Sequence, residues 1–372
     1  MASFAPANAQ GVSTPAEFAL IMDYDTGAIL FEKNADTPTA PASMSKLMTA
    51  AIVFEKLKSG ELTLNTAFSV SEKAWRMGGS KMWVRVDTEI TVENLLRGII
   101  IQSGNDACIV VAENISGSED AFADLMNRKA REWGLNNSSF ANPTGWPDPM
   151  QKMSMRDLGI LTHKIIKEYP EFYALFSEKE FSWEKINQPN RNPLLSSFEG
   201  SDGLKTGHTE ESGYGLVGSA IIDGTRRIIV LNGLDSAKSR STESRRLMRA
   251  AFNDFENVTL YGSGDIAGTA NVFAGKEKSV PLVTTTAVSS ILHRQLLDDL
   301  KATVIYEGPV KAPIVKGQQI GYLRIETGSD KVKEYPLFAG SDVKLLGVFG
   351  RISLAAKKLL AKPAEDTQAQ SQ

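Results

Sequence analysis

The chain has 372 residues, of which 42% are hydrophobic and 23% are charged, and its formal net charge is −3 at pH 7. This length allows more than one folded domain, and the slightly acidic balance argues against nucleic acid as the main partner. The single cysteine, Cys108, permits no internal disulfide, and the three scattered histidines form no zinc-binding motif, so no metal or other cofactor is expected.

Residues 1–14 show no pattern typical of a helix or a strand. Within them, Ala7-Asn8-Ala9 followed by Gln10 resembles the small-residue end of a secretory signal whose apolar region is missing. We interpret residues 1–14 as an export-signal remnant, which predicts an extracytoplasmic protein, and an ordinary flexible N-terminus is the alternative. No segment is long and apolar enough to predict a membrane-spanning helix.

Residues 15–255 are predicted to form one α+β catalytic domain, in which an antiparallel sheet is flanked by helices. The strongest strand signals are two hairpins, one around Asp25-Thr26-Gly27 and one around Asp223-Gly224. In chain order, the expected elements are strands 18–22 and 28–31, a helix from near Ser43 to Gly60, a loop-rich region 61–90 near a cleft, helices 91–101, 107–113, 119–134 and 155–167, strands 214–222 and 227–231, and a helix 242–255.

Residues 256–340 are rich in glycine, valine and threonine, and short strand-like runs at 279–283, 302–306 and 320–326 predict a small all-β domain. From 343 to 362, apolar residues recur at helical spacing among basic residues with no acid. We therefore expect an amphipathic helix over residues 341–362 that lies on an anionic membrane surface. A helix docked on its own β domain is the alternative. Residues 363–372 are polar and are predicted to be disordered.

Ser43 and Lys46 carry the first chemical signal. A proline and small residues precede Ser43 and an apolar helix follows it, so Ser43 is expected in the first helical turn, where backbone N–H groups favour developing negative charge. Lys46 lies on the same helix face, and a partly desolvated lysine can remove the proton of a hydroxyl. Alone, this spacing is close to chance, because it also occurs at Ser182/Lys185 and Ser341/Lys344.

Ser103 and Asn105 form the one Ser-x-Asn motif of the chain, at a break between two expected helices. Both side chains would project from a tight turn, where they can relay a proton and hold a substrate amide by hydrogen bonds. A helix cap followed by a glycine turn is the structural alternative for this motif taken alone.

Lys205-Thr206-Gly207 precedes an expected edge strand. Glycine permits close backbone approach, so this strand can align an extended peptide while Lys205 and Thr206 bind a carboxylate. A turn before a strand is the alternative, and the similar Lys58-Ser59-Gly60 is interpreted as a helix end with its glycine stop. Three motifs in this order, each in a suitable context, argue against coincidence.

Together, Ser43-x-x-Lys46, Ser103-Gly104-Asn105 and Lys205-Thr206-Gly207 resemble the motif trio of the penicillin-binding proteins and serine β-lactamases. Within that superfamily the chain resembles the low-molecular-mass D-alanyl-D-alanine carboxypeptidases. The resemblance covers roughly residues 15–360, with a β-lactamase/transpeptidase-like catalytic domain, the β domain and the amphipathic tail. The further matching segments are Pro41–Thr49, Asn142-Pro143-Thr144-Gly145, Asn190-Arg191-Asn192 and His208-Thr209.

The resemblance implies a serine acyl-transfer mechanism on peptidoglycan pentapeptides that end in D-Ala-D-Ala. Ser43 would attack the carbonyl between the two D-alanines with Lys46 as general base, and β-lactams would acylate the same serine. The backbone N–H groups of Ser43 and His208 would hold the oxyanion. The remaining roles would be proton transfer to the leaving amine by Ser103, a hydrogen bond to the peptide by Asn105, and carboxylate binding by Lys205, Thr206 and, from its place in Ser239–Ser244, Arg240. The resemblance also implies a periplasmic protein attached to the outer face of the inner membrane.

Three other functions stay open at this stage. A D,D-endopeptidase acting on cross-links would use the same residues in a cleft of different shape. A class A β-lactamase needs a glutamate near position 139, where this chain has Ser139. A non-catalytic envelope binding protein would not need Ser43, Lys46 and Ser103 to be intact. Pro193, where relatives often have glycine, and the polar tail after Lys362 depart from the family pattern.

Overall fold

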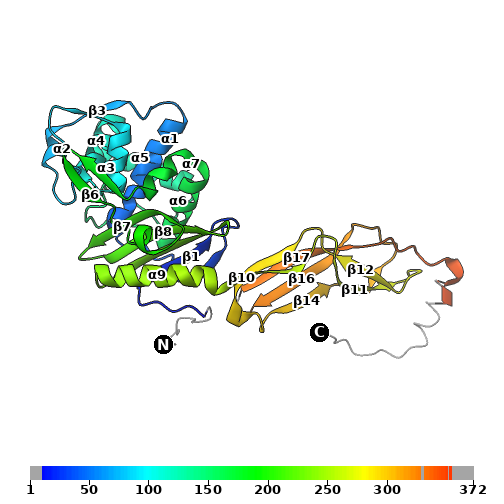
Figure 1. The fold of residues 1–372 in the computed structure, drawn as a ribbon. Coiled ribbons are helices and arrows are strands. Elements are labelled where there is room, and N and C mark those ends of the chain that lie inside the picture. Colours follow the sequence, from blue (N-terminus) through cyan, green and yellow to red (C-terminus); the bar gives the residue numbers. More distant parts are fainter. Residues whose placement is uncertain (1–10, 328–330, 351, 354–372) are drawn as a thin grey trace. The chain divides into compact units, whose positions relative to one another are not determined.

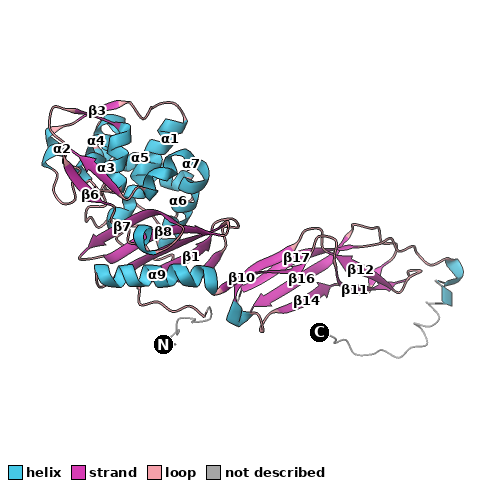
Figure 2. Cartoon of the chain, in the orientation of Figure 1, coloured by secondary structure: helices cyan, strands magenta, loops and turns pink. Residues whose placement is uncertain are grey.

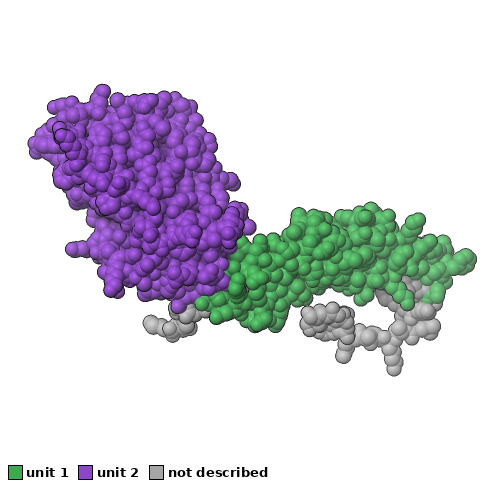
Figure 3. All heavy atoms as spheres, viewed as in Figure 1, with its two compact units in different colours: residues 1–11, 255–372 green, residues 12–254 purple. Residues whose placement is uncertain are grey.

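The computed structural model describes residues 11–327, 331–350 and 352–353 (Figure 1). The chain divides into two compact units, one formed by residues 12–254 and the other mainly by residues from 255 onward (Figure 3). The predictions for residues 1–10 and 363–372 lie outside the described residues. Among the residues that are described, no helix has the length and apolar character needed to cross a membrane.

A five-stranded antiparallel sheet forms the centre of the first unit, with the strand order β2-β1-β9-β8-β7. Both predicted hairpins are confirmed, because β1 pairs with β2 across Asp25-Thr26-Gly27 and β8 pairs with β9 across Asp223-Gly224. The strand β7 lies at one edge of this sheet, where only one side is paired. The strands are β1 (Phe18–Asp23), β2 (Ile29–Lys33), β7 (Ser201–Thr209), β8 (Gly213–Ile222) and β9 (Thr225–Leu234).

Helices cover both faces of this sheet (Figure 2). The helix α9 packs along β8 and β9 on one face, and α6 packs on β1 and β9 on the other face, the face on which α1, α3, α4 and α5 also lie. The core on the α6 side of the sheet contains side chains with no exposed surface, such as Leu20 and Leu47. The helices are α1 (Lys46–Lys58), α3 (Val92–Ile100), α4 (Asn105–Ser116), α5 (Glu119–Glu132), α6 (Met155–Glu168), α7 (Pro170–Tyr173), α8 (Leu194–Ser197) and α9 (Ala237–Asn253), with 3-10 turns η1 (Ala42–Ser45) and η2 (Ala174–Ser177).

Three helix starts differ from the prediction. Ser43 lies in η1, and α1 itself begins only at Lys46. The helix α4 begins at Asn105 rather than at 107, with the acidic Asp106 in its first turn, where a carboxylate stabilises the helix N-terminus. The helix α9 begins at Ala237 rather than at 242, because the hydroxyl of the preceding residue caps a polar stretch without apolar periodicity.

The loop-rich region 61–90 contains one short helix and two short paired strands that the sequence did not predict. A second small hairpin, also not predicted, follows α7 and η2. These pieces border the site described below. They are α2 (Glu72–Arg76), β3 (Ala67–Ser69), β4 (Glu89–Thr91), β5 (Glu180–Trp183) and β6 (Ile186–Pro189), with β3 paired to β4 and β5 paired to β6.

The second unit is all-β, as predicted. A six-stranded sheet has the order β14-β16-β17-β12-β11-β15, and β10 and β13 form a separate pair. Leu282, Leu323 and Leu337 lie fully buried in its core. The strands are β10 (Phe255–Tyr261), β11 (Ile266–Phe273), β12 (Ser279–Val283), β13 (Val288–His293), β14 (Lys301–Tyr306), β15 (Val310–Lys311), β16 (Gln319–Thr327) and β17 (Lys331–Ala339), with a 3-10 turn η3 (Arg294–Leu296).

The expected amphipathic helix does not begin at 341. Val343 and Leu345 instead form β-bridges with Ile314 and Gly275, because the buried side chain of Val343 completes the core of the β unit. Helical conformation starts at residue 348, and the rest of the expected helix, from residue 354 on, lies outside the described residues.

Candidate active site

Ser43 and Lys46 meet at the junction of η1 and α1. The Nζ atom of Lys46 lies 2.9 Å from the Oγ atom of Ser43, as expected for residues three apart on one helical face. Lys46 is fully buried, whereas Ser43 is only half-buried. A hydroxyl that solvent and substrate can reach is therefore placed against an amine that they cannot reach.

Two further oxygen atoms hold the amine of Lys46. The Oδ1 atom of Asn105 lies 2.8 Å from Nζ, and the carbonyl oxygen of Thr144 is a second acceptor. The amide of Asn105 is oriented by its other end, because Nδ2 donates to the carbonyl of Gly78 at 3.0 Å. An unprotonated lysine has two N–H donors and one lone pair. Since both donors have acceptors, the lone pair is left for the hydroxyl proton of Ser43.

Burial lowers the pKa of Lys46 to about 8, and the positive charge of Arg191 acts in the same direction. The negative charge of Asp106 opposes this effect. Burial also raises the pKa of the nearby Cys108 thiol to about 12, so this group stays uncharged near neutral pH. About a tenth of Lys46 is therefore unprotonated at pH 7, far more than for a lysine with the ordinary pKa.

A turn at residues 142–145 supplies the Thr144 carbonyl. The Oδ1 atom of Asn142 accepts hydrogen bonds from the backbone N–H groups of Thr144, Gly145 and Trp146, at 3.1, 2.9 and 3.0 Å. Gly145 has a φ of +77°, and a Cβ atom there would lie 2.0 Å from the carbonyl oxygen of Ala42. The sequence predicted a turn here, as is typical of an asparagine followed by Pro-Thr-Gly, but gave no role to the Thr144 carbonyl.

Ser103 and Lys205 form a second pair. The Nζ atom of Lys205 lies 2.9 Å from the Oγ atom of Ser103 and also donates to the carbonyl of Thr206 at 3.2 Å. Ser103 has a φ of +59°, in the tight turn that was expected before α4. Burial, with the charges of Lys46 and Arg191 adding to it, places the pKa of Lys205 well below its usual range. The two lysines are thus close enough for their charges to interact.

Lys205, Thr206 and Gly207 lie within the edge strand β7, beside η1, rather than before an edge strand as predicted. A Cβ atom on Gly207 would lie 2.8 Å from the carbonyl oxygen of Pro41 and would also crowd Ala42. The absence of a side chain at Gly207 therefore lets the edge strand approach the Ser43 turn closely.

His208 follows Gly207 on β7, and Arg240 of α9 contacts Gly207. The exposed His208 ring stacks on Tyr214 with 3.8 Å between the ring centres, and the Arg240 guanidinium lies 5.5 Å from the Tyr214 ring centre. The Nη1 atom of Arg240 also donates to the carbonyl oxygen of Gly207 at 3.5 Å. Its buried Nε atom has no hydrogen-bond partner among the described residues. This buried donor is therefore unsatisfied among the described residues.

Asp106 was missed in the sequence analysis, although it directly follows the Ser-x-Asn motif. Its buried carboxylate accepts the backbone N–H groups of Met82, Trp83 and Val84, at 2.8, 2.8 and 3.2 Å. The adjacent Asn105 donates its own N–H to the carbonyl of Ser80 at 2.7 Å. The loop before β4 is therefore fastened to the start of α4, and it forms a wall of the site.

Comparison with known protein families gives two matches. Residues 5–235 match the family described as D-alanyl-D-alanine carboxypeptidase. Residues 255–345 match the C-terminal domain of penicillin-binding protein 5. The first match contains Ser43, Lys46, Ser103, Asn105 and Lys205, and it ends just before Arg240.

Individual proteins agree with these families. The D-alanyl-D-alanine carboxypeptidase DacC of Escherichia coli is 37% identical over 91% of this chain and 87% of its own length. The crystal structure of the D-alanyl-D-alanine carboxypeptidase DacD from Francisella tularensis, 32% identical, covers 93% of this chain and 97% of its own with a TM-score of 0.80. Penicillin-binding protein D2 from Listeria monocytogenes in its ampicillin-bound form, 28% identical, covers 65% of this chain and 99% of its own with a TM-score of 0.60.

Proposed function

The chain belongs to the D-alanyl-D-alanine carboxypeptidase family of serine peptidases, and from this premise we propose that it removes the terminal D-alanine of peptidoglycan stem peptides through an acyl-enzyme on Ser43. The observation that carries this proposal is the position of the half-buried Ser43 hydroxyl, 2.9 Å from the buried amine of Lys46.

In the first step, Ser43 attacks the carbonyl carbon between the two D-alanines while Lys46 takes the hydroxyl proton. The acceptors at Asn105 and Thr144 keep the two N–H groups of the amine occupied, so its lone pair stays directed to Ser43. The pKa of about 8 matches a base that works near neutral pH, because the unprotonated form is present and still binds a proton readily.

The leaving D-alanine needs a proton on its amine and a cation for its carboxylate. Ser103 is in position to pass the proton, and Lys205 touches its hydroxyl at 2.9 Å. Arrival of a carboxylate favours the protonated form of Lys205, whose pKa burial and the neighbouring cations lower. Thr206 and the unpartnered Nε atom of Arg240 supply further donors for the same carboxylate.

The open edge of β7 can receive the peptide as an added strand. An extended stem peptide laid along residues 205–208 would run past Ser43, because Gly207 allows close approach of β7 to the Ser43 turn. The carbonyl oxygen that becomes the oxyanion would then lie between the backbone N–H groups of Ser43 and His208. One such donor contributes about 2.7–4 kcal/mol to stabilising a transition state.

Water then cleaves the acyl-enzyme and regenerates Ser43. A β-lactam presents a carbonyl and a carboxylate in a similar arrangement, so it would acylate Ser43 by the same first step and remain attached for longer. The ampicillin-bound structure of the Listeria relative supports this extension to the present chain.

We further propose a periplasmic location with contact at the membrane surface. The substrate polymer lies outside the cytoplasm, and the sequence from 343 to 362 is basic and amphipathic. Phe349, 90% exposed, and the exposed Val348 and Ile352 are apolar side chains at the start of that stretch. Exposed apolar groups beside a basic stretch are typical of helices that lie in the interface of a bilayer.

The test is mass spectrometry of the intact protein with penicillin, peptide mapping, and D-alanine release from a diacyl-Lys-D-Ala-D-Ala peptide. A stable adduct on Ser43 together with D-alanine release is the expected result. A fleeting adduct with rapid antibiotic hydrolysis would identify a β-lactamase instead. Cleavage of cross-linked dimers without D-alanine release would identify an endopeptidase, and no adduct at all would refute the role of Ser43.

A further inference from the structure

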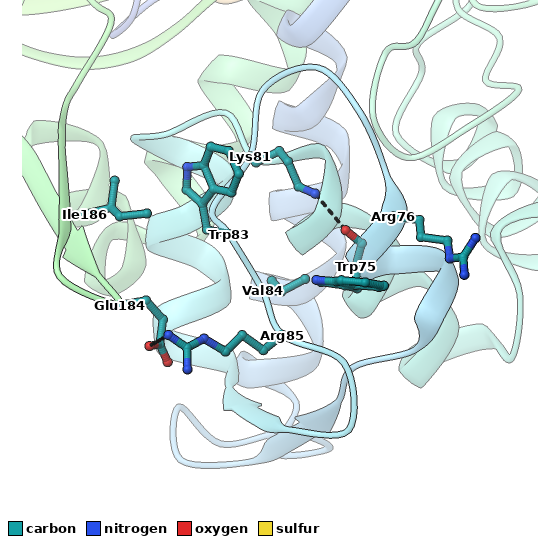
Figure 4. A pocket seen from close by; sticks show the side chains of 8 residues that line it. All are labelled: Trp75, Arg76, Lys81, Trp83, Val84, Arg85, Glu184 and Ile186. Carbon is teal, nitrogen blue, oxygen red and sulfur yellow. Dashed lines mark hydrogen bonds and ion pairs between the residues drawn. The ribbon is translucent and has the colours of Figure 1, made fainter.

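A pocket of about 550 Å³ opens on the first unit, and its lining comes from three segments (Figure 4). Helix α2, the loop that follows it and the turn between β5 and β6 each contribute side chains. None of the lining residues belongs to the three motifs. They are Trp75, Arg76, Lys81, Trp83, Val84, Arg85, Glu184 and Ile186.

Two exposed indoles are the main apolar surfaces of this pocket. Trp75 is 42% exposed and Trp83 is 49% exposed. The Nζ atom of Lys81 lies between their segments, since it donates to the carbonyl of Trp75 at 2.7 Å and stands 5.6 Å from the ring centre of Trp83. Large aromatic side chains left open in one concavity mark binding sites, because a soluble protein usually buries such groups.

Charged groups of both signs surround the indoles. Arg85 pairs with Glu184 at 2.7 Å (Figure 4). Arg76 pairs with Glu72, which lies one turn earlier on α2, at 2.6 Å. With Lys81, three cations and one carboxylate line the pocket. The pocket therefore offers flat apolar faces together with hydrogen-bond donors and an acceptor.

The pocket and the catalytic turn share one loop. Ser80 accepts the backbone N–H of Asn105 at 2.7 Å, and the neighbouring Lys81 and Trp83 line the pocket. The other side of the pocket is tied to this loop as well, because Gln188 of β6 donates to the carbonyl of Lys81 at 3.1 Å. A ligand in the pocket would therefore be held in a fixed relation to the Ser-x-Asn turn.

We propose that this pocket binds the saccharide chain of peptidoglycan, so that the enzyme holds its polymer at a second point besides the stem peptide. This inference rests on the proposed function. A sugar ring has a flat C–H face that stacks on an indole, and its hydroxyl and acetamido groups need donors and acceptors at the ring edge. The pocket supplies both. A purely hydrocarbon ligand would leave the charged rim unmatched.

The direct test is binding of peptide-free glycan strands, prepared by removing all stem peptides, to the full-length protein. Tryptophan fluorescence is the readout, because both indoles would change environment. We expect a saturable change, and we expect Trp75→Ala and Trp83→Ala each to weaken binding by about tenfold, as loss of one stacked ring predicts. Trp75→Phe should retain part of the affinity. Tyr322→Ala, which removes an exposed aromatic ring from the β unit, is the matched control and should bind as the unaltered protein does.

A kinetic comparison separates this inference from the proposed function. Trp75→Ala should lower kcat/KM for D-alanine release from glycan-linked pentapeptide by about tenfold and leave release from a soluble diacyl-Lys-D-Ala-D-Ala peptide unchanged. If the unaltered protein releases D-alanine from the soluble peptide but binds no glycan strand, or if Trp75→Ala treats both substrates as the unaltered protein does, the pocket proposal is wrong and the proposed function stands. Failure on the soluble peptide would instead refute the proposed function.

Discussion

The amide of Asn105 presents its oxygen, 2.8 Å away, to the amine of Lys46. Its nitrogen is turned away and donates to the carbonyl of Gly78 at 3.0 Å. A carboxylate in this place would pair with Lys46 and keep it protonated, whereas a neutral acceptor positions the amine without doing so. An amide at position 105 therefore favours the unprotonated form of Lys46, which can act as a base.

The first prediction concerns the pH dependence of the unaltered protein. Only the unprotonated amine of Lys46 can take the proton of Ser43, and its pKa is lowered to about 8. The rate of acylation by penicillin should therefore rise with pH and level off above about pH 8. Stopped-flow measurement of acylation from pH 5.5 to 10 checks this. A rate that is flat or falling across that range would contradict the role of Lys46 as base.

The second prediction changes the neighbour of that base. Asn105→Asp places a negative charge beside Lys46, which favours the protonated form of the lysine. The acylation rate should therefore rise with pH only at values about one to three pH units higher than in the unaltered protein. Acylation should then be slow at pH 7 and recover in more alkaline buffer. Asn105→Ala is the control, because it removes the amide without adding charge and should not recover with pH. An unshifted profile for Asn105→Asp would show that this contact does not tune the base.

The third prediction is that Ser43→Ala abolishes acylation, with a loss of turnover on the order of a millionfold, as for other catalytic serines. The free energy of unfolding should change by no more than about 1 kcal/mol, because a half-buried hydroxyl contributes little packing. Ser182→Ala is the matched control, since Ser182 has the same spacing to Lys185 but lies on β5. Penicillin labelling of Ser43→Ala at the normal rate would overturn the mechanism.

The fourth prediction tests the turn that supplies the Thr144 carbonyl. Gly145→Ala should destabilise the fold by about 1–3 kcal/mol and slow acylation, because its φ is +77° and the new methyl group would meet Ala42. Gly117→Ala isolates the conformational part, since Gly117 has a φ of +82° with nothing within 4 Å. Gly145→Ala should lower the unfolding temperature and the acylation rate more than Gly117→Ala does. Equal effects of the two substitutions would show that the close contact with Ala42 is unimportant.

The fifth prediction concerns the C-terminal stretch. A chain that ends at Gly347 keeps the bridges of Val343 and Leu345, so its β unit should remain folded. Such a chain should release D-alanine from soluble peptide at the normal rate but no longer sediment with anionic lipid vesicles. Phe349→Glu in the full chain should also weaken sedimentation, because it puts a charge on an exposed apolar position. Undiminished vesicle binding by both variants would refute the membrane contact.

Local patterns in the sequence predicted the parts of this molecule that depend on neighbours along the chain. The spacing of Ser43 and Lys46 predicted their contact, and the Asp223-Gly224 turn predicted the pairing of β8 with β9. Short elements without a clear period, such as α2 and the β5–β6 hairpin, were missed because their conformation depends on tertiary contacts.

Contacts between distant segments could not be predicted in this way. The Thr144 carbonyl reaches Lys46 across 98 positions of sequence, and nothing in its own residue type marks it as an acceptor. The predicted start of the helix over 341–362 was wrong for a related reason. Val343 fits an apolar helical period equally well, but the buried space in the β unit determines its place.

The fastening of the Met82–Val84 segment by Asp106 bears on how such an enzyme can evolve under drug selection. In the proposed mechanism Asn105 positions the base, while its neighbour in the chain holds a loop outside the three motifs. If the proposed mechanism holds, a population exposed to a β-lactam could acquire resistance through substitutions in that loop, because a displaced loop would shift the catalytic turn through Asp106 and through the bonds of Asn105 to Gly78 and Ser80. Surveillance confined to the three motifs would overlook them.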